Sequence, residues 1–186
     1  MEAFSDGVIA IIITVMVLEL RPPPSTDPAA LRPLIPVFLS YVLSFVNLGI
    51  YWNNHHHLIQ AIEHVNGRVL WANLHLLFWL SLFPFGTAWM GENNFALWPV
   101  AVYGIELLMA AIAYFILVRA LLSLHGWHST LAAALGSDFK GRISILIYVV
   151  AVALAFVNAW IAFAIYIFVA AIWFVPDRRI EKKLEH

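Results

Sequence analysis

The sequence predicts an all-α, polytopic membrane protein with six transmembrane helices, and three observations lead to that prediction. Of the 186 residues, 63% are hydrophobic and only 11% are charged, where a soluble domain has about 25% charged residues. The mean hydropathy is +0.87. The apolar residues gather in stretches close to the roughly 20 residues that a membrane-spanning helix needs. A soluble protein cannot cover this much apolar surface, because its largest exposed apolar patch stays within a few hundred Å².

The first predicted span covers residues 4–20. It ends where three consecutive prolines, Pro22, Pro23 and Pro24, prevent a helix from continuing. The proline-rich segment 21–36 that follows is expected to form a stiff loop outside the cytoplasm.

Three further spans follow this loop. The second covers 37–57 and ends in a run of asparagines and histidines at 53–57. The third covers 68–89, and Pro84 predicts a kink near its end. The fourth covers 97–122.

The last two spans come from one long apolar stretch, 143–175. As a single helix it would be roughly 50 Å long, against a hydrocarbon core of about 30 Å. A break is therefore required, and Asn158 is the most polar residue near its middle. We place the fifth span at 142–157 and the sixth at 159–175, closed by Pro176.

The distribution of positive charge predicts the topology. Of the 10 lysine and arginine residues, only Arg21 and Arg32 fall in loops on one side of the predicted spans. The others fall on the opposite side: Arg68, Arg119, Lys140, Arg142, Arg178, Arg179, Lys182 and Lys183. The positive-inside rule then places both termini in the cytoplasm of a multi-pass protein of the cell membrane.

The composition also excludes several classes of function. The formal net charge is −1 without any basic block, so we expect no nucleic-acid partner. The absence of cysteine removes disulfides, cysteine zinc ligands and cysteine nucleophiles. Motifs such as Gly-x-Ser-x-Gly and His-Glu-x-x-His are missing, so we expect no enzyme. We expect a single membrane domain over residues 1–183, and we interpret residues 184–186 as the remnant of a purification tag.

An apolar stripe runs along the first span. At about 100° per residue, Ile11, Val15 and Leu18 project within roughly 60° of one another, with Thr14 at the edge of the stripe. Periodicity alone favours lipid contact or helix packing for such a stripe, with a pore lining as the less common alternative. Asp6 points about 140° away from Ile11 and therefore faces a different environment.

Two interpretations of Asp6 are open. Either Ser5 or Asp6 caps the N-terminus of the first helix, where a carboxylate suits the helix dipole. Alternatively, Asp6 joins a hydrogen-bond network with Trp52, Asn53 and Asn73, because a polar group in a membrane needs a partner.

Histidines form a second polar group. His55 and His56 end the second span, and His75 lies inside the third. Imidazole is the commonest metal ligand, so haem or metal ligation is one hypothesis for them. Membership of the Asp6 network is the more favoured one, and we expect no metal site.

Residues 4–14, Phe-Ser-Asp-Gly-Val-Ile-Ala-Ile-Ile-Ile-Thr, resemble the first helix of the transmembrane protein 175 family. This family comprises the lysosomal potassium channel and its single-repeat prokaryotic homologues. The second and third helices of the family resemble Ser44-Phe45, Tyr51-Trp52-x-x-His55-His56, Asn73-x-His75-x-Leu77 and Pro84-Phe85. An arginine that family members usually carry four residues before the phenylalanine would precede residue 1.

The resemblance implies a homotetrameric, potassium-permeable channel in which the first helices line the pore, with no re-entrant filter loop and no cofactor. By position, Ile11 matches the hydrophobic constriction, Val15 and Leu18 match further pore layers, and Thr14 matches a polar layer implicated in selectivity. The motif that ties the first helix to its neighbours is matched by Phe4, Ser5 and Asp6. The partners implied are the lipid bilayer and monovalent cations.

Several alternatives stay open. Glu19 either adds an acidic ring at the outer mouth of the pore or is solvated or paired with Arg21 or Arg32. A channel of this architecture that conducts protons is a close variant. A haem-bearing redox protein that uses the histidines, and a structural membrane protein without transport, are hypotheses of other classes.

Overall fold

The computed structural model describes residues 1–62, 64–126 and 139–174, and within those ranges the chain forms helices and their connections. The predicted all-α class is confirmed for this part of the chain. Three helical segments are long and apolar enough to cross a bilayer: Pro28–Gln60, Gly67–Glu92 and Leu97–His125.

The first predicted span is the helix α1, Glu2–Leu18, which ends before the three prolines. The predicted loop contains a short 3₁₀ helix, Pro28–Leu34. Asp27 starts this helix by accepting a hydrogen bond of 2.8 Å from the backbone N–H of Ala29. The helix α2, Ile35–Gln60, follows directly, with a proline in its first turn, where a helix does not need the N–H that proline lacks.

The third predicted span is present as two helices, α3, Gly67–Ser81, and α4, Phe83–Glu92. Pro84 has no N–H to donate to the preceding turn, so the helix is interrupted just before it and the predicted kink is confirmed. The helix α5, Leu97–His125, begins where the fourth span was predicted and continues three residues beyond position 122.

The long apolar stretch is broken where the sequence predicts it. The helix α7, Phe139–Ala155, and the helix α8, Ala159–Phe174, are separated at Asn158. The side chain of Asn158 accepts a 2.9 Å hydrogen bond from the backbone N–H of Trp160, which satisfies a donor at the start of α8. Residue 175, Pro176, the basic residues at 178–183 and the expected tag remnant at 184–186 lie outside the described residues.

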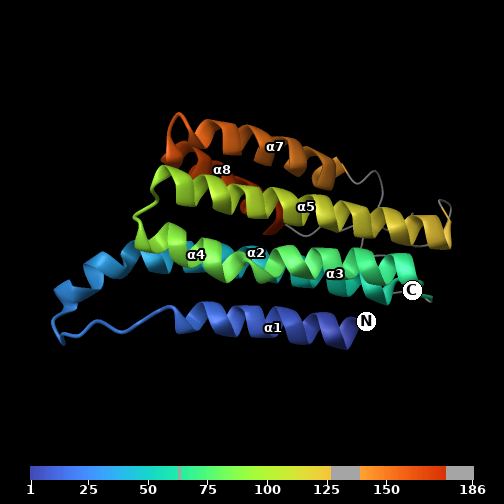
Figure 1. Cartoon of the computed structure of the whole chain (residues 1–186), viewed down its shortest axis with the longest axis horizontal. Helices are drawn as coiled ribbons and strands as arrows, with labels where there is room; N and C mark the ends of the chain where they lie inside the picture. Colours follow the sequence, from blue (N-terminus) through green and yellow to red (C-terminus); the bar gives the residue numbers. More distant parts are fainter. Residues whose placement is uncertain (63, 127–138, 175–186) are drawn as a thin grey trace.

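α5 lies at the centre of the bundle, in contact with α3, α4, α7 and α8. α1 lies along one edge, where it packs on α2, α3 and α4, and α7 lies on the far side of the molecule (Figure 1). One side of α1 is therefore covered by other helices of the protomer, and the other side is not covered by any described residue.

Two glycines of α4 lie close to neighbouring helices, and of these two Gly91 is the one that meets backbone. A Cβ on Gly91 of α4 would lie 2.7 Å from Cα of Val37 in α2. A Cβ on Gly86 of α4 would collide with the carboxyl group of Glu106 in α5. Glu106 is only 4% exposed, and its Oε2 has no hydrogen-bond partner among the described residues. Sequence reasoning assigned it no role, although a charged residue inside an apolar span is itself a signal.

We predict that Gly91→Ala destabilises the protein by about 1–3 kcal/mol, because the backbones of α2 and α4 must separate to admit the methyl group. Thermal unfolding in detergent measures the effect. Gly49→Ala in α2 is the matched control, since its added Cβ has no neighbour within 4 Å. Equal unfolding temperatures for the two variants would show that the close crossing is not required.

Candidate functional site

α1 has one covered and one uncovered face. The covered face packs on α2, α3 and α4 and consists of Ser5, Ile9, Ile12 and Met16. On the other side, Ile11 is 64% exposed and Leu18 is 72% exposed. We call this side the open face of α1; it comprises Phe4, Gly7, Ile11, Thr14, Val15 and Leu18. The residues of the predicted stripe thus share one uncovered surface.

Thr14 contributes a hydroxyl group to the open face. Its Oγ1 donates a 2.8 Å hydrogen bond to the carbonyl of Ala10, one turn earlier in α1. A hydroxyl that donates in this way retains lone pairs on its oxygen. Because the side chain is exposed, that oxygen is available to water or a cation outside the protomer.

Glu19 follows the last residue of α1. It lines an open hollow together with Glu92 at the end of α4, so two carboxyl groups face the same space. Within the described ranges no ion pair joins Glu19 to Arg21 or Arg32. Sequence reasoning missed Glu92, which the fold alone brings to this end of α1.

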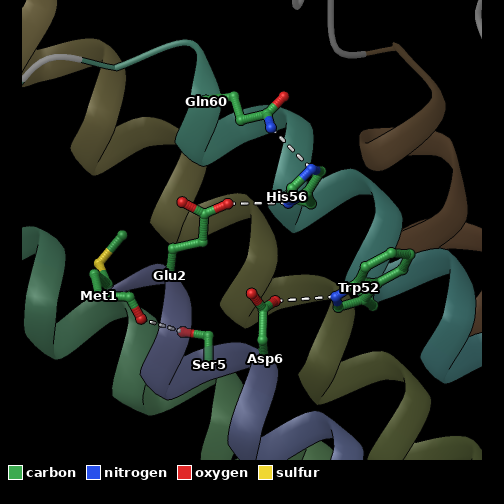
Figure 2. Close-up of polar contacts among 7 residues, drawn as sticks. All are labelled: Met1, Glu2, Ser5, Asp6, Trp52, His56 and Gln60. Atoms are coloured by element: carbon green, nitrogen blue, oxygen red, sulfur yellow. Dashed lines mark hydrogen bonds and ion pairs between the residues drawn. The ribbon is translucent and has the colours of Figure 1, made fainter.

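The capping interpretation of Asp6 is wrong. α1 begins at Glu2 with Met1 as its N-cap residue and no side-chain capping bond, so Asp6 lies inside the helix. Its Oδ1 accepts a 2.9 Å hydrogen bond from Nε1 of Trp52 on α2 (Figure 2). Ser5 does not cap the helix either, because its hydroxyl donates to the carbonyl of Met1.

A buried chain of hydrogen bonds joins α1, α2 and α3. Nε2 of His55 lies 2.7 Å from Oδ1 of Asn73, and Nδ2 of Asn73 donates to Oγ of Ser5 over 2.9 Å. An amide oxygen only accepts, so His55 carries a proton on Nε2. The donors then run in one direction, from His55 through Asn73 and Ser5 to the carbonyl of Met1. All three side chains are at most 2% exposed, so the chain is sealed from water.

The other predicted members of the network lie apart from this chain. His75 accepts a 2.9 Å hydrogen bond from Nε1 of Trp79, one turn along the same helix. The side chain of Asn53 is exposed and makes no hydrogen bond within the described part of the chain. Nδ1 of His56 lies 3.0 Å from Oε1 of Glu2, a residue that sequence reasoning did not single out.

Sequence reasoning also missed a second buried polar cluster. Oγ of Ser44 on α2 lies 2.6 Å from Oγ1 of Thr87 on α4 and 2.9 Å from the hydroxyl of Tyr103 on α5. The available signal was the recurrence of Ser40, Ser44 and Asn47 on one side of α2 at helical spacing. These hydroxyl groups join three helices in the middle of the bundle.

We predict that Asn73→Leu, which removes both amide hydrogen bonds at similar volume, destabilises the protein by about 1–3 kcal/mol for each buried group left unpaired. Asn53→Leu makes the same chemical change at an exposed site and is expected to have little effect. Thermal unfolding in one detergent compares the two, and equal losses would contradict a structural role for the buried chain.

Comparison with known proteins identifies the family. The profile described as endosomal/lysosomal potassium channel TMEM175 matches residues 1–84. A protein of Chryseobacterium sp. named a potassium channel is 55% identical over 185 residues, which cover 100% of this chain and 96% of the relative. A protein of Streptomyces collinus with the same description is 30% identical over 177 residues, covering 85% and 82%.

The fold agrees with a solved relative. The crystal structure of a lysosomal potassium-selective channel TMEM175 homologue from Chamaesiphon minutus superposes with a TM-score of 0.81 at 28% sequence identity. The match covers 94% of each chain. On the sequence profile, the full-length relatives and the shared fold together, this chain belongs to the TMEM175 family.

Proposed function

We propose that this chain is the subunit of a potassium-permeable cation channel in the cell membrane. The observation that carries the proposal is the open face of α1, which is apolar except for Thr14 and is not covered by any of the residues that the structure describes. The relatives that match almost the whole chain are named potassium channels, which favours an ion pathway over lipid contact for this face. Four protomers would place four open faces around a central axis.

In the proposed assembly each protomer crosses the membrane six times, with both termini in the cytoplasm and one domain over residues 1–183. The three long apolar segments, together with α1, α7 and α8, supply the six spans. No re-entrant loop is part of the proposal, because a first-helix lining does not need one. The arrangement of positive charge in the sequence supports the orientation.

The open face suggests how such a pore would work. A ring of four Ile11 side chains cannot coordinate a cation, so an ion must keep its water or lose hydration energy to pass. Thr14 lies one turn after Ile11 in α1, so four copies of it would offer hydroxyl oxygens directly after this constriction, toward Leu18. Val15 and Leu18 would form further apolar layers, and Glu19 would add carboxylates at the outer mouth.

Proton conduction is a second candidate, because vertebrate relatives are named endosomal/lysosomal proton channels. The zebrafish relative is 28% identical over 130 residues, which cover 67% of this chain and 24% of that protein. A haem protein is disfavoured, since Nε2 of His55 and Nε2 of His75 are both engaged in hydrogen bonds. The proposal therefore includes no prosthetic group and no catalysis, and a Soret absorption band in purified protein would contradict it.

Planar-bilayer recording of purified protein tests the proposal, with potassium and sodium on opposite sides at equal pH. A potassium channel gives a reversal potential displaced toward the potassium equilibrium potential. A reversal potential that follows an imposed pH gradient instead would favour the proton candidate, and the absence of current would favour a structural protein.

We predict that Ile11→Asn raises potassium flux into liposomes about tenfold and weakens discrimination against sodium. A polar ring retains water in the constriction, and a barrier lowered by about 1.4 kcal/mol corresponds to that factor. Flux is compared at equal amounts of folded, reconstituted protein.

Val17→Asn is the control for this variant. Val17 is also exposed on α1 but lies about 120° around the helix from Ile11. Ile12 is unsuitable because it is buried, and an asparagine there would destabilise the packing. Equal flux in the wild type and Ile11→Asn would remove Ile11 from the constriction.

We predict a homotetramer whose first helices lie nearest its axis. Native mass spectrometry is expected to give four copies of the 21.0 kDa chain. The chain has no cysteine, so Leu18→Cys introduces a single thiol on the open face. A short bifunctional thiol reagent is expected to join two protomers through it, whereas Val149→Cys, exposed on α7, is expected to remain uncoupled. A monomer mass, or equal coupling at both positions, would contradict this assembly.

A further inference from the structure

Three metal-ligating side chains converge beside the N-terminus of α1. Glu2 and Asp6 lie one turn apart on α1, and His56 faces them from α2 (Figure 2). One ligand atom from each residue lies within 4.8 Å of the other two. All three side chains are partly buried, so solvent can reach them while their positions are restricted by the two helices.

The contact between His56 and Glu2 has the distance of an ion pair but not the direction of a hydrogen bond. Nδ1 of His56 lies 3.0 Å from Oε1 of Glu2, yet this buried nitrogen has no hydrogen-bond partner in the described part of the chain. The distance is within hydrogen-bond range, so the direction is what fails. The two atoms are also close enough to bind one metal ion. Ligands about 2.0 Å from a tetrahedral zinc ion are roughly 3.3 Å apart, close to this separation.

Neighbouring residues already orient two of the three groups. Nε1 of Trp52 donates to Oδ1 of Asp6, which leaves the second oxygen of that carboxylate without a partner among the described residues. Nε2 of His56 lies 2.9 Å from the side-chain amide of Gln60. Metal-binding histidines usually donate their other ring N–H to an oxygen, and a half-turn of the Gln60 amide would place its oxygen at this position.

We infer that Glu2, Asp6 and His56 form a binding site for a divalent transition-metal ion of the zinc class, which joins α1 to α2. The mixed set of one imidazole and two carboxylates favours zinc over magnesium or calcium, since these harder ions take oxygen ligands. Small side-chain rotations close the remaining gaps between the ligand atoms. The site goes beyond the proposed ion conduction, and binding at it does not depend on whether the protein conducts.

Isothermal titration of zinc chloride into detergent-solubilised protein, prepared without a histidine tag, tests the site. The wild type is expected to bind one ion per protomer and to unfold at a higher temperature with zinc than without it. An excess of magnesium is not expected to displace the zinc.

Two variants test proposed ligands, and a third tests a residue that orients one of them. Glu2→Gln and His56→Gln each remove a ligand and are expected to abolish both the titration step and the zinc-dependent rise in unfolding temperature. Gln60→Leu removes an orienting partner and is expected to weaken binding by about 10–100-fold. The matched controls are Glu92→Gln and His64→Gln, which make the same changes away from the cluster and are expected to bind like the wild type.

Two results would overturn the inference: no zinc binding by the wild type, or unchanged binding by both Glu2→Gln and His56→Gln. Because Glu2 is only partly buried and lies in the first turn of α1, its replacement is not expected to prevent folding. Unfolding of each variant without zinc checks this directly. Ion flux plays no part in the readout, so failure of the channel proposal would leave the result unaffected.

Discussion

The rotation of α1 about its own axis is set by polar groups that cannot be left unpaired in a membrane. Ser5 is held by the buried amide of Asn73, and Asp6 is held by the indole N–H of Trp52. These bonds reach α1 from two different helices and fix which side of it faces the bundle. The open face is the consequence, because Ile11 and Leu18 project away from both bonds.

The two sides of α1 differ in whether neighbouring helices pack against them, and not in how apolar they are. Both sides are largely apolar, so a hydrophobic pattern alone does not separate packing, lipid contact and a pore lining. The polar residues do show which side is packed, since Ser5 lies on the packed side and Thr14 on the open one. A second polar cluster, at Ser44, Thr87 and Tyr103, ties together the helices on which α1 rests. The helices α2, α3 and α4 thus hold α1 in place, while the open face of α1 is not covered by any described residue.

Much of the fold is readable in the sequence, because length and proline position decide where helices stop. The break at Asn158 and the kink before Pro84 follow from the thickness of a bilayer and the missing proline N–H. Side-chain partners are harder to predict. Of the three partners expected for Asp6, the structure pairs it with Trp52, whereas Asn53 makes no hydrogen bond among the described residues and Asn73 pairs with His55 and Ser5. Glu2 and Glu92 acquire their neighbours only through contacts between helices, for which no spacing along the chain gives a signal.

Thiol accessibility along α1, read as potassium current, tests most directly whether its open face lines the ion pathway. The protein contains no cysteine, so single cysteines at positions 7, 11, 14 and 18 and at positions 9, 12 and 16 are each the only thiol present. A positively charged, water-soluble thiol reagent is applied to channels in a planar bilayer. A pore lined by the open face predicts loss of current for the first set and unchanged current for the second. Loss of current at positions 9, 12 and 16 with none at 7, 11, 14 and 18, or unchanged current at every position, would contradict it.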